Sequence, residues 1–271
     1  MATAQNKRVG GLAQAFSPNK ILSPGTMQII IIVQVVAFLI FWSMSPFKVL
    51  PKPGETWQGF VKLWTEQGLY TNLVSSFMLN VKALAITTVI SLGFAYLSVM
   101  PFFRPIVSAL SKGRFLSLVG FSLLFTLVFE GGATLKLVLL VFGMSVFFIT
   151  SMASVVTEIP KEAFDHARTL RMSEWRVVWE VVIRGTADRA LEVMRQNAAI
   201  GWMMLTMVEG IVRSEGGVGV QLLNNQKYMN LAAVWAIQIT ILILAVAQDA
   251  IIGLLRRVLF PYSVLTVERA S

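Results

Sequence analysis

Few side chains of this chain are placed to do chemistry, and the most unusual are ionisable groups inside apolar runs. Lys82, Glu209 and Asp249 each lie within a hydrophobic stretch. Placing an ionisable group in such a stretch is costly, so these groups are often functional. Lys82 and Glu209 are therefore candidate site residues, whereas an ion pair with Arg256 or Arg257 is the simpler explanation for Asp249.

Each candidate also has a structural interpretation, which stays open. Lys82 either extends its amine to a membrane–water interface or attracts an anionic solute. Glu209 accepts hydrogen bonds from the glycine-rich turn at 214–219, pairs with a nearby cation, or lines an outer gate. Trp202 and Gln238 are the other candidates for lining a path, although packing is the commoner role of tryptophan.

Sequence patterns typical of enzymes are missing. The chain has no cysteine and one histidine, His166, which excludes disulfides, cysteine–zinc sites and thiol catalysis. It contains no GxxxxGK[ST] loop for nucleotide phosphates, no HExxH metal motif and no paired-carboxylate pattern. We therefore expect no enzymatic activity of its own, no catalytic or metal-binding residues and no cofactor.

The composition indicates a protein whose main solvent is lipid. Only 14% of the 271 residues are charged and 56% are hydrophobic, whereas soluble domains carry about 25% charged residues. A helix needs about 20 apolar residues to span a membrane. The candidate spans are Met27–Met44, Leu73–Met100, Phe115–Phe129, Leu135–Val155, Asn197–Val212 and Ala232–Leu255. This pattern predicts an all-α integral membrane protein with about six transmembrane helices, in one domain at 27–265 between tails at 1–26 and 266–271.

The distribution of positive charge predicts the orientation in the membrane. With a cytoplasmic N-terminus, 16 of the 23 lysines and arginines fall on cytoplasmic segments and 6 on outer segments. This bias follows the positive-inside rule for a multi-pass protein with both termini in the cytoplasm. The net charge of +9 then reflects orientation, so we expect membrane lipid and no nucleic acid as a partner.

A charged segment at 156–196 interrupts the apolar runs. It holds seven basic and seven acidic residues, so it is not a polybasic lipid anchor. Pro160 suits the first position of a helix. The apolar positions of this first helix form one stripe, which comprises Ala163, Phe164, Ala167 and Leu170.

A second helix is predicted directly after the first. Ser173 is expected to cap it. Its apolar positions follow a helical period and are Trp175, Val178, Trp179 and Val182. Arg176–Glu180 and Glu180–Arg184 have the spacing of ion pairs on the solvent side, and Thr186 is a candidate cap for a third helix.

The first helix needs a surface to pack on. About ten residues are too few for a helix that is stable alone in water. Ala163 and Ala167 allow close approach, and Phe164 is a bulky anchor of the kind that fills a pocket on a partner. The residues leave two interpretations open: docking onto a soluble partner, or a hairpin folded under its own bundle.

The charged segment resembles a known motif. Glu162-Ala163-Phe164, followed by Leu170-Arg171-Met172-Ser173 and Trp175, is similar to the EAA loop of ABC importer permeases. In that family the loop forms coupling helices that insert into a cleft of an ATPase subunit. The resemblance implies that the residues coupling this chain to an ATPase are Glu162, Ala163, Phe164, Ala167, Leu170, Arg171, Ser173 and Trp175.

Other parts of the chain, over residues 50–260, resemble the nitrate/sulfonate/taurine-type branch of these permeases. Leu50-Pro51-Lys52-Pro53 is similar to the outer entry of that branch. Trp202, Glu209 and Gly217-Val218-Gly219 resemble its fifth span and the following turn, and Leu254-Leu255-Arg256-Arg257 resembles its basic exit. The type I importer architecture that this implies also has six spans.

The sequence departs from the EAA motif at three places. Phe164 replaces the second alanine, Arg184-Gly185 replaces a Leu-Pro, and Arg171 stands where the motif has a glycine that ends the first coupling helix. If position 171 needs a left-handed backbone, arginine costs about 1 kcal/mol more than glycine there.

The resemblance implies a function and a set of partners. It predicts the membrane-spanning permease of a bacterial ABC importer in the inner membrane, with separate ATPase subunits, a second permease subunit as a homodimer, and an extracytoplasmic solute-binding protein. A membrane scaffold that recruits a regulator through its cytoplasmic loop is the alternative. A secondary transporter is a third candidate, but the mid-membrane ion pairs or inverted repeats that it needs are not evident.

Overall fold

The computed structural model describes residues 23–47 and 49–261. Helices joined by short turns make up this part of the chain, and it contains no strand, which agrees with the predicted all-α fold. The predicted tail at 266–271 and all but four residues of the tail at 1–26 lie outside the described residues, as does Lys48.

Four helices in the described ranges are long and apolar enough to cross a membrane. They are α1 (Pro24–Ser43), α3 (Leu69–Leu97), α6 (Gly132–Thr157) and α11 (Leu231–Leu259). They coincide with the first, second, fourth and sixth predicted spans. The fifth predicted span lies in α9 (Ala187–Ile211), whose 25 residues extend about 37 Å but include a charged first half.

The third predicted span, Phe115–Phe129, corresponds to a helix that is shorter than predicted. α4 (Arg104–Lys112) and a short 3-10 turn at Gly113–Phe115 precede α5 (Leu118–Val128), and the two parts meet at 110°. The extended backbone of Leu116, with ψ of 136°, separates them. The 11 residues of α5 cover about 16 Å, roughly half of a hydrocarbon core. The described residues therefore give four spans, or five with the bent pair, and six spans stay a prediction.

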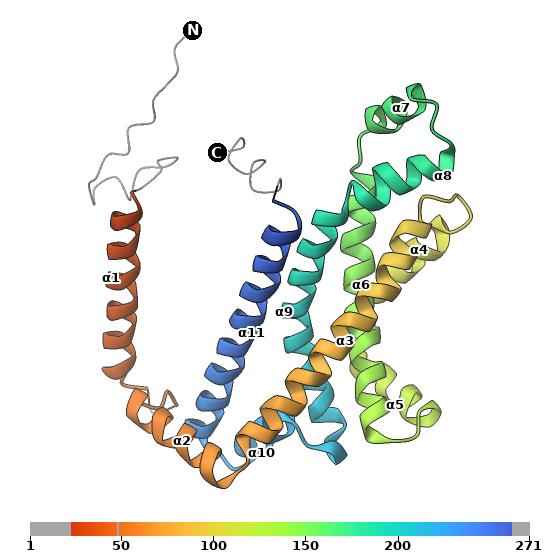
Figure 1. Ribbon diagram of the computed structural model, residues 1–271. Coiled ribbons are helices and arrows are strands. Elements are labelled where there is room, and N and C mark those ends of the chain that lie inside the picture. Colours follow the sequence, from red (N-terminus) through yellow and green to blue (C-terminus); the bar gives the residue numbers. More distant parts are fainter. Residues whose placement is uncertain (1–22, 48, 262–271) are drawn as a thin grey trace.

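The centre of the bundle is formed by α3, α6 and α9. α3 and α6 lie side by side, α9 packs on both, and α11 packs against α9 (Figure 1). At the crossing of α3 and α9 a Cβ on Gly201 would lie 2.6 Å from Oδ1 of Asn80, so only glycine allows this approach. The fully buried side chains of the core include Leu140, Met144, Phe148, Leu205 and Ile237.

α1 stands apart from this bundle. No residue of its apolar stretch is buried in the described part of the chain, and Figure 1 shows it beyond α11. Its C-terminal end is fixed by a hydrogen bond of 2.9 Å from Nε1 of Trp42 to the carbonyl of Pro51.

Two short helices close the end of the bundle opposite the charged segment (Figure 1). α2 (Pro53–Glu66) carries an aromatic face, and Gly68 follows it with φ of 61°. In this helix Trp57 stacks on Phe60 with centroids 5.5 Å apart. α10 (Val218–Lys227) was not anticipated from the sequence, because its apolar positions are too few to show a period.

A buried acid joins three elements at this end. Glu209 on α9 accepts a hydrogen bond of 2.5 Å from Ser76 on α3 and one of 2.7 Å from the backbone N–H of Gly219 on α10. Ser76 in turn accepts a bond of 2.9 Å from the N–H of Val218. A Cβ on Gly217 would overlap the Glu209 carboxyl group. Of the alternatives left open for Glu209, the structure thus shows the hydrogen bond from the glycine-rich turn.

Ser76→Ala tests how much this junction contributes to stability. The change removes the donor to Glu209 and leaves the N–H of Val218 without an acceptor, so we expect a loss of about 2 kcal/mol of unfolding free energy. Denaturant unfolding in detergent micelles measures it. Ser75→Ala is the control, since Ser75 is exposed. An equal effect of both substitutions would contradict this role of Ser76.

Candidate functional site

The charged segment folds as a helical hairpin at one end of the bundle. Figure 1 shows it beyond α6 and α9, on the side to which α4 and the C-terminal end of α11 also point. Its helices are α7 (Lys161–Thr169), α8 (Glu174–Val177) and a π-helix (Val178–Arg184) that leads into α9. Pro160 precedes α7 at the N-cap, one residue earlier than predicted.

The turn between α7 and α8 depends on a left-handed residue. Arg171 has φ of 54°. This conformation lets the backbone N–H groups of Arg171 and Met172 donate to the carbonyls of Arg168 and Ala167, at 2.8 and 3.4 Å. The bonds close the C-terminal end of α7, as in the common glycine-ended helix caps. Position 171 thus has the left-handed backbone that was stated as a condition above, and an arginine occupies it in place of glycine.

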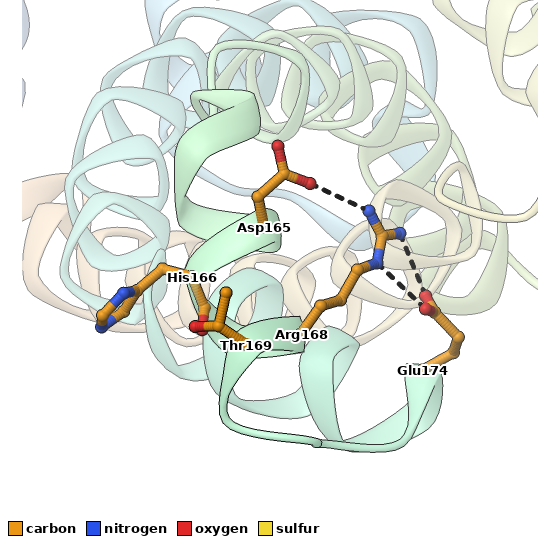
Figure 2. A network of polar contacts seen from close by, with 5 residues as sticks. All are labelled: Asp165, His166, Arg168, Thr169 and Glu174. Carbon is orange, nitrogen blue, oxygen red and sulfur yellow. Dashed lines mark hydrogen bonds and ion pairs between the residues drawn. The ribbon is translucent and has the colours of Figure 1, made fainter.

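Arg168 ties the two helices of the hairpin together, as Figure 2 shows. Its Nε and Nη2 donate to the two carboxylate oxygens of Glu174 at 3.0 and 3.2 Å, and its Nη1 donates to Asp165 at 3.3 Å. The hydrogen bond from Arg168 lowers the pKa of Glu174 below its ordinary value. Asp165–Arg168 has a recognisable helical spacing, but the contact with Glu174 crosses the turn and was missed.

The predicted coupling residues divide between two faces. Ala167 is buried, and Ala163 and Phe164 are half-buried, so this part of the stripe faces the protein. Leu170 and Trp175 are 60% and 70% exposed, and Trp179 is 55% exposed. The other predicted coupling residues are exposed and polar: Glu162, Arg171 and Ser173. We call Leu170, Trp175 and Trp179 the exposed apolar surface of the hairpin.

The π-helix connects the hairpin to α9. The N–H of Gly185 donates to the carbonyl of Glu180, five residues back, at 3.1 Å. A Cβ on Gly185 would overlap the carbonyl oxygen of Val181, which explains the glycine at this departure from the motif. Thr186 lies at the N-cap of α9 as predicted, but its hydroxyl donates to the carbonyl of Val182 at 2.7 Å and does not cap the helix. Ser173 likewise occupies the N-cap of α8 without a side-chain cap bond.

Ion pairs fix the base of the hairpin. Arg256 on α11 binds Glu192 on α9 at 2.8 Å, and Arg195 binds Asp249 at 3.2 Å. The expected pairing of Asp249 with Arg256 or Arg257 was therefore wrong, because Arg195 reaches it across the α9–α11 contact. Of the two predicted helical pairs, Glu180–Arg184 is present at 3.1 Å, whereas no Arg176–Glu180 pair occurs in the described ranges.

The four candidates for a path are not joined to one another. Trp202 is buried, and its Nε1 donates to Oε1 of Gln248 at 2.8 Å. Glu209 is buried in the junction described above, whereas Lys82 on α3 and Gln238 on α11 are exposed. No hydrogen bond or ion pair connects any two of these four in the part of the chain that the structure describes, and their role in a path stays a prediction.

Long apolar helices with a structured polar hairpin at one end are typical of the class of integral membrane proteins. The chain belongs to the family described as binding-protein-dependent transport system inner membrane component, whose model matches residues 9–260. It is thus a membrane permease of an ABC transport system, and the family implies partnership with ATPase and binding-protein components. No curated protein matches the chain.

Arg171→Gly should stabilise the hairpin. Glycine adopts a left-handed backbone without the Cβ penalty, so we expect a gain of about 1 kcal/mol. Hydrogen exchange of the α7 amides measures the local opening free energy. Arg171→Ala keeps the Cβ and removes the rest of the side chain, so it should bring no gain, and a gain equal to that of glycine would rule out the backbone explanation.

The Arg168–Glu174 pair predicts a pH dependence of the turn. Because the folded pKa of Glu174 is depressed below 4.5, the pair stabilises above pH 4.5 and this contribution is lost as the pH falls through the folded value. Exchange rates of the turn amides, corrected for intrinsic pH effects, should show this step, and Arg168→Gln should remove it. Arg176→Gln is the matched control, since no ion pair of Arg176 is found in the described residues; a step that survives Arg168→Gln contradicts the assignment.

Proposed function

We propose that this chain is the membrane-spanning subunit of a bacterial ABC importer and that its hairpin at 158–184 receives the conformational change of separate ATPase subunits. The observation that carries this proposal is the exposed apolar surface of the hairpin. Leu170, Trp175 and Trp179 lie outside the apolar spans and still leave more than half of each side chain uncovered. Exposed tryptophans on a structured polar segment are typical of protein-binding surfaces.

The hairpin has the rigidity that such a contact needs. The bidentate Arg168–Glu174 bond and the closed turn at Arg171 hold α7 against α8. The buried Ala167 and Val177 anchor the inner face. A partner would therefore meet a preformed surface, which lowers the entropic cost of binding.

A continuous chain of contacts supports transmission from the hairpin to the spans. The π-helix runs from α8 into α9, and α9 is tied to α11 by the ion pair between Glu192 and Arg256. Movement of the hairpin toward a second copy would then tilt α9 and α11 together. We propose that ATP-driven closure rocks the spans between inward- and outward-open states, a two-state element that both sites bias.

The remaining assignments extend this proposal. Two copies of the permease pair around a central path, with both termini in the cytoplasm of a bacterial cell and the loop at 156–196 on the same side. A solute-binding protein delivers a small solute from outside, and the branch resemblance favours nitrate-, sulfonate- or taurine-like anions. The exposed Lys82 is the residue that supports an anionic solute, and Gln238 is a further candidate on α11.

The assignment of the coupling residues follows their exposure. Trp175 and Leu170 are proposed to contact the ATPase directly, together with Glu162, Arg171 and Ser173. Phe164, with Ala163 and Ala167, is proposed to act from the inner face by seating α7 on the bundle. A membrane scaffold remains the second candidate, because the same exposed surface could bind a regulatory protein that has no ATPase activity.

Trp175→Asp tests the proposal. A tagged copy of the chain, isolated from membranes of its source cells, should carry an ATPase that contains a GxxxxGK[ST] motif, and the variant should lose most of it. Placing a carboxylate in a desolvated contact costs several kcal/mol, so at least a tenfold loss is expected. Trp57→Asp is the matched control, since Trp57 is 66% exposed at the opposite end. Isolation of the complex without any such ATPase would favour the scaffold.

A further inference from the structure

We infer that the chain binds an anionic phosphate group in a cavity between α4 and the N-terminal end of α7. The cavity measures about 550 Å³ and lies where the ends of α3 and α6 meet these two short helices. Arg104, the first residue of α4, and Lys161, the first residue of α7, both line it. α4 and α7 are distant in the sequence, and each thus contributes one cationic residue to the lining of the same cavity.

The charge balance of the cavity is one-sided. No aspartate or glutamate is among its lining residues, although the charged segment beside it holds seven acidic residues. Hydroxyl groups from three elements belong to the polar lining: Ser98, Ser108, Ser111 and Thr157. The hydroxyls of Ser98 and Thr157 already donate to helix carbonyls. The guanidinium and ammonium groups, with the hydroxyls of Ser108 and Ser111, are therefore the donors that a phosphate would meet.

The two cations are placed but not neutralised. The guanidinium of Arg104 is held by bonds from Nε to the carbonyl of Ser98 at 3.3 Å and from Nη2 to that of Val99 at 3.4 Å. These carbonyls are uncharged, and the group keeps further N–H donors for a ligand. Lys161 makes neither an ion pair nor a side-chain hydrogen bond within 23–47 and 49–261. Its positive charge is therefore available to an anion.

The apolar part of the lining adds information about the ligand. Val107, Val156, Ile159 and Phe164 contribute side chains to the same space. Because the cavity lies at the ends of two apolar helices, the headgroup of an anionic phospholipid would find its phosphate near the cations and its glycerol carbons near these side chains. Free phosphate shares the charged part of this chemistry, and the test below separates the two sources.

A bound phosphate would also act on the hairpin. It would bridge Arg104 on α4 and Lys161 on α7, and so hold the inner face of α7, including Phe164, against the bundle. This regulatory consequence rests on the proposed function, since it matters only if α7 transmits a movement. The binding itself does not depend on that function and is measured on the permease alone.

The experiment compares two double variants of the full chain in lipid nanodiscs. Arg104→Gln/Lys161→Gln removes both cavity cations. Lys112→Gln/Arg114→Gln removes two cations that follow on the same segment but do not line the cavity, with the same change in net charge. Native mass spectrometry measures retained phosphatidylglycerol against phosphatidylcholine, and thermal unfolding in phosphatidylcholine nanodiscs measures stabilisation by inorganic phosphate.

Loss of two cations should weaken the binding about thirtyfold in the cavity variant and little in the control. Selective loss of phosphatidylglycerol identifies a lipid ligand, and loss of only the phosphate-induced thermal shift identifies free phosphate. Equal losses in both double variants, or no binding of either probe by the original chain, would overturn the inference.

Arg104 also holds two carbonyls, so its substitution can unfold the segment. Lys161→Glu alone is the second variant, because Lys161 makes no such contact in the described ranges. It should reduce binding at least tenfold while the unfolding temperature without ligand stays unchanged, and undiminished binding in Lys161→Glu would likewise overturn the site. If binding persists but no ATPase accompanies the chain in the Trp175 experiment, the phosphate site stands and its regulatory role falls.

Discussion

The arrangement of one end of the bundle depends on the hydrogen bonds of the buried Glu209 carboxyl group. Within an apolar environment every polar group needs a partner, and Glu209 supplies one to Ser76 and to the backbone of the turn at 216–219. Lys136 contributes a further bond, of 2.5 Å, to the carbonyl of Gly216. The glycines of this turn allow the backbone to come close enough, so α3, α9 and α10 meet at a fixed point.

The opposite end is held by different forces. The hairpin is joined by Arg168 and the turn at Arg171, and its base by ion pairs of Arg195 and Arg256 that are partly exposed. Exposed pairs contribute about 1 kcal/mol or less each. One end of the molecule is therefore joined by buried hydrogen bonds, whereas the other is joined by exposed ion pairs, a closed turn and a small buried face formed by Ala167 and Val177.

Much of the fold could be predicted from the sequence, because long apolar runs and helical periods depend on local pattern. The four long helices and the place of the hairpin were found in this way. The left-handed backbone at Arg171 was raised only as a condition, from the glycine of the resembled motif. The short length of α5 was not predicted, because the apolar run from Phe115 to Phe129 does not show that Leu116 and Ser117 are extended. Contacts between distant elements, such as Arg195 with Asp249 and Arg168 with Glu174, have no local pattern. Phe164 is half-buried and Leu170 is exposed, although both belong to the predicted apolar stripe of the hairpin. This difference depends on packing, so the sequence alone could not predict it.

The π-helix at Val178–Arg184 fixes the rotational phase between the hairpin and α9. Bonds that span five residues in place of four accommodate one extra residue in the helix. The π-helix takes up the extra residue locally, so a single deletion here would leave a regular α-helix with the hairpin in nearly the same phase. A deletion in the regular part of α9 would instead turn everything before it by about 100° around the helix axis. The π-helix is therefore the place in this connection where the loss of one residue would be tolerated best.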